Sequence, residues 1–251
     1  MSEPKRDVAE LVTRLSDDTL GRRERGRLLV ALTGLVGSGA RAAGLRALVS
    51  GRWVADTVTQ QVAEQIAPHL PVRDLLTLRE HHGGLSGEAL AEALVRTASR
   101  TTAAVGAGAG AVTAAELAAP PALLTAPVLL AAETIVVVAV ELKLVAELHA
   151  VFGRAPTGSR AELAVAYLTS WASRRAVPRP ETAGGSPRAS LASALSGAVR
   201  QQVRQRIVHR LGRNLTSFVP FLAGAVAGAE LNRRETRALG EALIRDLQPR
   251  R

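Results

Sequence analysis

The chain has 251 residues, 47% of them hydrophobic and only 2% aromatic, and it contains no cysteine. This length and apolar content exclude wholesale disorder, and the lack of cysteine excludes disulfides and thiolate metal sites. The 32 Lys and Arg residues exceed the 22 Asp and Glu residues and give a net charge of +10. Such an excess suits an anionic partner, either lipid headgroups or nucleic acid, and a GC-rich genome would also produce it.

Because aromatic residues are scarce, Ala, Leu and Val must fill the core. Small side chains favour close packing of helices over a β-sheet. The apolar spacing is helical throughout, so the sequence predicts an all-α helical bundle. The N-terminus has no apolar run, so we expect no signal peptide and place the protein at the cytoplasmic face of the cell membrane, with the cytoplasm as the alternative.

Residues 1–50 form the first predicted region. An amphipathic helix over 4–16 precedes a solvated basic segment at 21–27, which leads into an uncharged, Gly-rich stretch at 28–40. Region 51–173 follows, and three helices are expected in its first half. They are a helix from Trp53 that ends at Pro68, a short helix over 72–82, and a helix from the N-cap Ser86 to about Arg100.

The centre of the chain is the apolar stretch Thr102–Ala132, whose single charge is Glu116. Its adjacent prolines, Pro120 and Pro121, cannot lie deep within one straight helix, because the proline ring clashes with the preceding turn. We therefore predict an Ala/Gly-rich helical hairpin with arms over 101–118 and 122–152.

Beyond the hairpin, Ser159 and Glu162 have the spacing of a capping box and predict the start of another helix. The stretch 174–190 is rich in Pro, Gly and Arg and is typical of a linker. The last region, 191–251, begins with a basic amphipathic helix. Three of its arginines are candidate lipid-binding residues: Arg200, Arg204 and Arg210.

A second uncharged segment, Asn214–Ala229, contains Pro220 and predicts a second apolar hairpin before a charged helix over 232–247. The uncharged apolar runs, Leu117–Ala132 and Asn214–Ala229, are each about four residues short of a bilayer span, and arginines lie beyond both ends of each apolar segment. This pattern favours a hairpin that dips into a membrane, or a helix buried in a bundle, over a helix that crosses once.

Four residues of this part of the chain recur at intervals of four and form a candidate helix-packing motif. On a helix they lie along one side, where glycine lets a second backbone approach closely and an amide can bond across the contact. They are Pro220, Gly224, Gly228 and Asn232.

Carboxylates in apolar surroundings must pair, take up a proton or face water. Glu133 and Glu141 are therefore candidate binding residues, with neutralisation by an arginine as the simpler interpretation. Glu147 and His149 are two residues apart, which does not suit a helical metal site, so we expect no metal and no cofactor. The glycines Gly106, Gly108 and Gly110 fit close helix packing better than a dinucleotide-binding turn, because no strong strand precedes them.

Two blocks of the sequence resemble the EcsC family. One runs from Glu133 to Gly153, with Phe152 and His149 where that family has Tyr and Ala, and the other is the packing motif ending at Asn232. The resemblance covers about residues 50–247 and implies a helical, membrane-linked protein. It implies no catalytic residue, and the family takes its name from a gene beside an ABC-transporter pair.

From the residues and the resemblance we expect a non-catalytic, membrane-associated protein that binds anionic lipid or a membrane surface. It would be accessory to an ABC transporter or to envelope lipid handling. The alternatives are a basic nucleic-acid-binding protein and an unrecognised lipid hydrolase. Against these, six aromatic residues leave little for base stacking, and the sequence presents no nucleophile–base pair.

Overall fold

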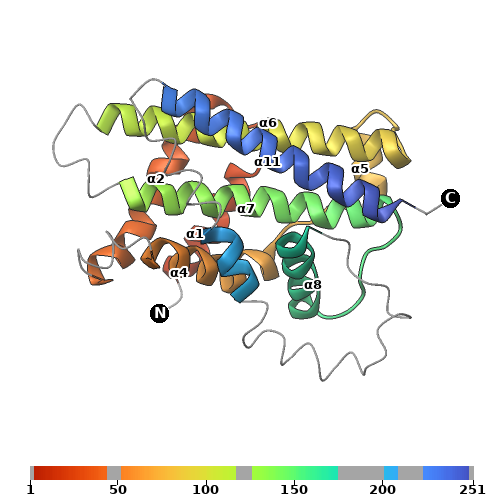
Figure 1. Ribbon diagram of the computed structural model, residues 1–251, viewed down its shortest axis with the longest axis horizontal. Helices are drawn as coiled ribbons and strands as arrows, with labels where there is room; N and C mark the ends of the chain where they lie inside the picture. The colour runs from red at the N-terminus through yellow and green to blue at the C-terminus, as the bar shows by residue number, and fades with distance from the viewer. Residues whose placement is uncertain (1–2, 44–51, 117–125, 175–200, 209–222, 249–251) are drawn as a thin grey trace.

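The computed structural model is an elongated bundle of helices (Figure 1). It describes residues 3–43, 52–116, 126–174, 201–208 and 223–248. Every regular element within these ranges is helical and none is a strand. The predicted all-α fold is therefore confirmed.

The elements follow one another along the chain with several abrupt changes of direction. They are α1 (Glu3–Leu15), α2 (Arg22–Ala43), α4 (Arg52–Gln61), the π-helical turn η1 (Val62–Ile66), the 3-10 turn η2 (Ala67–His69), α5 (Leu75–His81), α6 (Gly87–Glu116), α7 (Ala126–Val151), α8 (Arg160–Ser173) and α11 (Ala223–Leu247). A further helical stretch covers 201–208.

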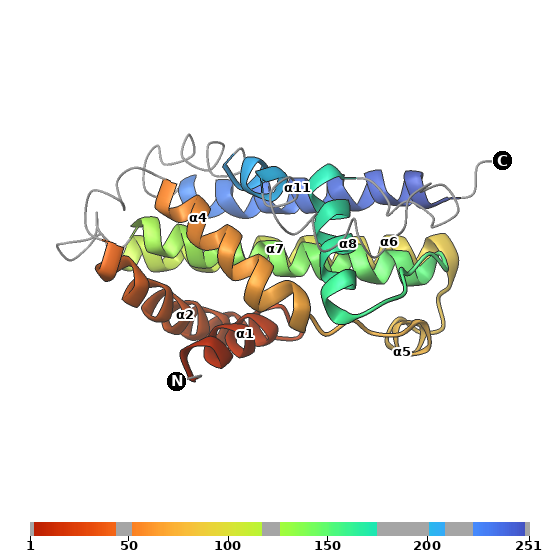
Figure 2. The same ribbon diagram turned by 90° about the horizontal axis from the view of Figure 1, so that it is seen from below.

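Helix α7 is the axis of the bundle. Twenty of its 26 residues are buried, and they lie on every side of the helix. A helix that is apolar all round is stable only inside a protein or a bilayer. Here α1, α2, α4, α6, α8 and α11 all pack against it, with α1 and α2 on one side and α11 on the other (Figure 2). The core that results runs from Val8 to Leu247 and joins the predicted regions 1–50, 51–173 and 191–251.

The first predicted hairpin is formed by α6 and α7, which run antiparallel side by side (Figure 1). The predicted boundary near Arg100 is wrong, because α6 continues from Gly87 to Glu116. Neither proline nor a cap interrupts the helix at this point. The hydroxyls of Ser99 and Thr101 donate to carbonyls one turn back and so keep polar residues within the helix. The predicted tip at Pro120 and Pro121 lies outside the described residues.

The second predicted hairpin is described only from Ala223 onwards. Gly224, Gly228 and Asn232 lie in one continuous helix, α11, as the packing motif requires, so the charged helix predicted from residue 232 begins earlier, at Ala223. Helix α11 lies along α6 for most of its length and runs in the opposite direction (Figure 1). Pro220 and the rest of the expected first arm lie outside the described residues.

The predicted solvated basic segment at 21–27 is wrong at one position, because Arg25 is buried. Its guanidinium donates to the backbone oxygens of Leu15 (2.6 Å), Asp17 (2.9 Å) and Leu20 (3.2 Å). These bonds satisfy carbonyls at and beyond the end of α1, where the helix itself has no donors left. Burial lowers the pKa of Arg25.

The capping box at the start of α8 is confirmed. The Ser159 N–H donates to Glu162 Oε2 at 2.7 Å, and the Glu162 N–H donates to Ser159 Oγ at 3.3 Å. The helix ends at Ser173, and its C-cap residue, Arg174, has a left-handed φ of 56°. Residues 175–190 of the predicted linker lie outside the described part of the chain.

Glycines allow α6 and α11 to touch at their backbones. A Cβ added to Gly106 would lie 2.7 Å from Asn232 Nδ2 and 3.0 Å from the carbonyl oxygen of Gly228. Gly240 likewise leaves no room, because a Cβ there would clash with the side chain of Val95. The structure thus brings two members of the candidate packing motif, Gly228 and Asn232, against Gly106. Gly224 also lies in α11.

This contact predicts opposite effects for two alanine substitutions. Gly106→Ala should destabilise the protein by about 1–3 kcal/mol, because the new methyl group overpacks the contact. Gly228→Ala should be neutral or stabilise by up to about 1 kcal/mol, because its Cβ would be 4.0 Å from the nearest atom, Gly106 O, and alanine favours helix. Urea unfolding followed by circular dichroism measures both changes. Equal effects of the two substitutions would contradict this geometry.

Candidate functional site

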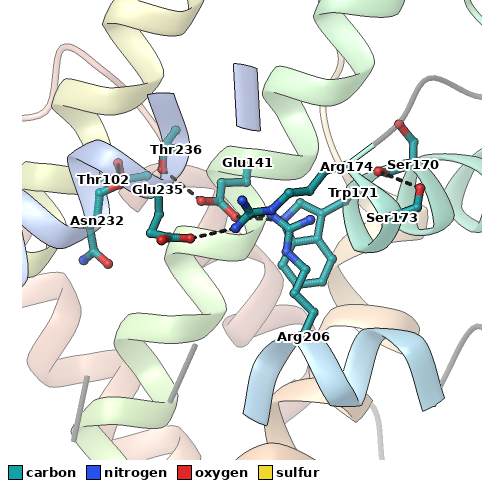
Figure 3. Close-up of polar contacts among 10 residues, drawn as sticks. All are labelled: Thr102, Glu141, Ser170, Trp171, Ser173, Arg174, Arg206, Asn232, Glu235 and Thr236. Atoms are coloured by element: carbon teal, nitrogen blue, oxygen red, sulfur yellow. Dashed lines mark hydrogen bonds and ion pairs between the residues drawn. The ribbon is translucent and has the colours of Figure 1, made fainter. Parts of the chain in front are cut away.

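Glu141 of α7 is the most completely buried carboxylate in the described residues, with no exposed surface. Trp171 Nε1 of α8 donates to its Oε2 at 2.7 Å, and Thr236 Oγ1 of α11 donates to its Oε1 at 2.9 Å (Figure 3). Each carboxylate oxygen thus accepts a hydrogen bond from a different helix. The carboxylate therefore ties α8 and α11 to the central helix.

Arg206 closes the same cluster from the helical stretch 201–208. Its Nη2 lies 3.9 Å from Glu141 Oε2, and its guanidinium carbon lies 4.2 Å from the centroid of the Trp171 ring (Figure 3). The side chain is only 12% exposed. A guanidinium over an indole in such a dry position is stabilised by about 2 kcal/mol. Arg206 therefore neutralises Glu141 and fastens its own helix to the bundle.

The apolar face of 201–208 is also turned inward, since Val203 and Ile207 are buried in the core. On this helix the arginines divide into two kinds. Arg206 is enclosed, whereas Arg204 is 40% exposed and its Nε bonds to Asp56 Oδ1 of α4 at 2.8 Å. The other two candidate lipid-binding arginines, Arg200 and Arg210, lie outside the described residues.

An ion pair borders the cluster where α8 ends. Arg174 Nη2 lies 2.8 Å from Glu235 Oε2 of α11 (Figure 3). Both side chains are partly exposed, so this pair contributes at most about 1 kcal/mol. Its position beside Trp171 and Thr236 nonetheless adds a second link between α8 and α11.

Glu133, the second candidate acid on α7, is bound by the packing motif. Asn232 Nδ2 donates to Glu133 Oε1 at 2.8 Å, and Thr102 Oγ1 donates to the backbone oxygen of Asn232 at 3.4 Å. Asn232 is buried and connects α6, α7 and α11. Both candidate acids therefore hold helices together, Glu141 fully enclosed and Glu133 partly exposed.

A groove of about 500 Å³ lies between the first half of α6 and the second half of α11. Arg100 and Arg245 line it, and neither forms an ion pair with any described residue. Arg96 pairs with Glu92 (3.6 Å) and Arg237 with Glu241 (2.7 Å), whereas Arg233 pairs with Glu230 (2.7 Å), which lies outside the lining. In full, its charged residues are Arg96, Arg100, Arg233, Arg237, Arg245, Glu88, Glu92 and Glu241. Five positive charges therefore face three negative ones.

Sequence reasoning missed this arginine groove. Charges that recur every three or four residues, as from Glu88 to Arg100 and from Arg233 to Glu241, are typical of a solvated helix face. The excess of positive charge appears only when α6 and α11 lie side by side, a contact between residues more than 100 positions apart. The sequence signal was limited to uncompensated arginines on two separate helices.

No described group of three or more His, Asp or Glu is placed to hold a metal ion. None of the helices, as far as the structure describes them, is both long and apolar enough to cross a bilayer. Comparison of the chain with protein families, with curated proteins and with solved structures finds no match.

The buried cluster predicts a large effect of removing the Glu141 carboxylate. Glu141→Ala should destabilise the protein by about 3–5 kcal/mol, because the Arg206 charge and the indole N–H lose their buried partner. Glu141→Gln is the matched control, since it preserves the shape and one acceptor oxygen and should cost less. Urea unfolding monitored by circular dichroism gives both values. A loss below 1 kcal/mol for Glu141→Ala would show that the cluster does not hold the helices.

His149 of α7 predicts a pH dependence of stability. The side chain is buried, its Nδ1 lies 2.7 Å from the backbone oxygen of Val145, and its ring meets Tyr167 edge-on at 5.9 Å. Burial chiefly lowers the pKa of His149, and the charge of Arg154 lowers it further.

Because the unfolded histidine titrates near pH 6.5, the stability held by neutral His149 is complete above that pH. It is lost as the pH falls below 6.5 towards the lowered pKa of the folded state. The free energy of unfolding of the parent should therefore decline between pH 7.5 and 5.5 more steeply than that of His149→Leu. Parallel curves for the two proteins would refute this role of burial.

Proposed function

We propose that this is a non-catalytic, membrane-associated protein that binds anionic lipid headgroups at the cytoplasmic membrane surface. The arginine groove between α6 and α11 carries the proposal, because five arginines meet there with three glutamates. Arg100 and Arg245 are the strongest contributors, since neither is paired with a described carboxylate. A basic side chain near an anionic bilayer surface contributes about 1 kcal/mol to binding.

The proposal also agrees with the charge of the whole chain. The net charge of +10 attracts an anionic surface before any contact forms. Arg204, on the exposed side of 201–208, is a further candidate contact, and the expectation for Arg200 and Arg210 stays as the sequence predicts it. The described amphipathic helix contributes charge and not apolar insertion, because Val203 and Ile207 are buried in the bundle.

The two alternative functions find less support in the described residues. Binding of single-stranded nucleic acid relies on exposed aromatic rings for stacking, yet Trp171 and Tyr167 are buried. A hydrolase requires a hydroxyl activated by a base. The buried hydroxyls of Thr59, Ser99 and Thr134 instead donate to backbone oxygens one turn back.

The resemblance to the EcsC family is the basis for a more specific role. It supports a protein that accompanies an ABC transporter or takes part in envelope lipid handling. Such a partner would meet the same membrane surface as the groove. This part of the proposal rests on the sequence blocks at 133–153 and 220–232 alone.

Reversal of the two unpaired charges tests the groove. The double variant Arg100→Glu, Arg245→Glu should bind vesicles of phosphatidylglycerol and phosphatidylcholine at least about 30-fold more weakly than the parent, which corresponds to about 2 kcal/mol. The matched control is Arg27→Glu, Arg79→Glu, which makes the same change in net charge at exposed positions of α2 and α5. Sedimentation with vesicles measures both.

The control variant should lose much less affinity than the groove variant. Equal losses would show that net charge alone drives binding and would refute the groove as the site. A parent that shifts DNA in a salt-sensitive manner but does not sediment with anionic vesicles would favour the nucleic-acid alternative instead.

A further inference from the structure

A second pocket, of about 350 Å³, lies where α1, the turn after it and the η1–η2 turns meet α7. Ligand pockets in proteins commonly have volumes of 300–1,000 Å³, with apolar walls and a few convergent polar groups. Ile66 and Leu70 form part of the apolar wall here. Lys143 of α7 and Arg73 bring positive charge to the lining, and Asp17 and Asp18 of the turn after α1 bring negative charge.

The positively charged side chains of this pocket have N–H groups that no described acceptor uses. Lys143 is partly buried on α7 and forms no ion pair with any described residue. Arg73 donates through Nε and Nη2 to the two carboxylate oxygens of Glu147, at 2.8 and 3.1 Å. A guanidinium has five N–H groups, so the two on Nη1 remain for another acceptor.

The carboxylates of this pocket also have oxygen atoms that accept no hydrogen bond from a described donor. Asp17 Oδ1 accepts from the N–H of Thr19 at 2.9 Å and from its hydroxyl at 2.7 Å, which leaves Oδ2. These hydrogen bonds chiefly lower the pKa of Asp17, and the charge of Lys143 lowers it further. Asp18 is exposed and forms no ion pair within the described chain. The carboxylate of Asp17 is therefore ionised at neutral pH.

Opposite charges thus face one cavity without touching one another. Lys143 influences Asp17 through space, yet the two are farther apart than the 4.0 Å of an ion pair. Removing an ammonium from bulk water is costly unless an anion takes the place of the water. A ligand that spans the pocket would satisfy both ends at once, and the apolar wall would cover a short carbon chain between them.

We propose that this pocket binds a small zwitterion, with its carboxylate or phosphate at Lys143 and Arg73 and its protonated amine at Asp17 and Asp18. Two sources supply this chemistry, a free amino acid and a phosphoethanolamine headgroup. The proposal does not rest on lipid binding by the arginine groove, because the groove is lined by α6 and α11 and this pocket by other elements.

Calorimetric titration of the full chain with O-phosphoethanolamine and with β-alanine tests the site. At least one of the two should bind saturably, and the tighter one identifies the source. Ethanolamine and inorganic phosphate, each of which carries one charged end, should bind at least tenfold more weakly. No saturable heat with either zwitterion at millimolar concentration would overturn the proposal, as would phosphate alone binding as tightly as phosphoethanolamine.

Two variants test which charged residues bind each end of the zwitterion. Lys143→Met should weaken binding of the zwitterion at least tenfold and leave the weak binding of ethanolamine unchanged. The double variant Asp17→Asn, Asp18→Asn should weaken the zwitterion similarly and leave phosphate unchanged. Arg79→Met, an exposed change on α5 outside the pocket, is the control, and circular dichroism checks that each variant is folded. Wild-type affinity in both variants would refute the site.

These outcomes are separate from those of the proposed function. The groove variant Arg100→Glu, Arg245→Glu should keep full affinity for the soluble zwitterion. Lys143→Met should still sediment with anionic vesicles. Failure of one site therefore leaves the result for the other intact.

Discussion

The structure depends on the complete burial of α7. An apolar helix of this kind cannot lie at a protein–water surface, so other helices must cover it on every side. Burial of each large apolar side chain, such as Ile135 or Leu142, contributes about 1.5–3 kcal/mol. The same burial makes a charge on α7 costly unless it is satisfied within the protein. Glu141 therefore sets where α8, α11 and 201–208 must lie.

A core with few aromatic residues demands close approach between helices. Leu, Val and Ala leave gaps unless the backbones come near one another, and glycine removes the last obstacle. Gly106 and Gly240 are the positions at which α6 and α11 have no space for a methyl group. Close approach also brings Asn232 within reach of Glu133. The small residues and the buried polar hydrogen bonds thus both belong to the same close packing of the helices.

The all-α fold, the α6–α7 hairpin and the capping box at Ser159 could be predicted from the sequence, because each depends on residues close together in the chain. Asn232 was singled out for the same reason, through its four-residue spacing from Gly228. For Glu141 the sequence predicted neutralisation by an arginine but not which arginine. The pairing of Glu141 with Arg206 joins residues 65 positions apart and requires the bundle to form first.

Predictions from the local sequence pattern were wrong at positions where contacts between distant parts of the chain decide the structure. Arg25 belongs to a run that reads as solvated, yet it is buried because the carbonyls at the end of α1 need donors. The change in polarity near Arg100 does not mark the end of a helix, because α6 continues to Glu116 and packs against α11 on both sides of this residue. The arginine groove and the zwitterion pocket were missed because each is assembled from separate helices.

The spacing of the charges on α7 explains how one apolar helix serves two different purposes. Each residue turns a helix by about 100°, so Glu141 and Lys143 point about 200° apart, to opposite sides. Lys143 and Glu147 are four residues apart and share a face. That face meets Arg73 and the pocket beside α1, whereas Glu141 meets α8 and α11. The charge that holds the helices together is enclosed, and the charge that faces the pocket keeps its hydrogen-bonding capacity for a ligand.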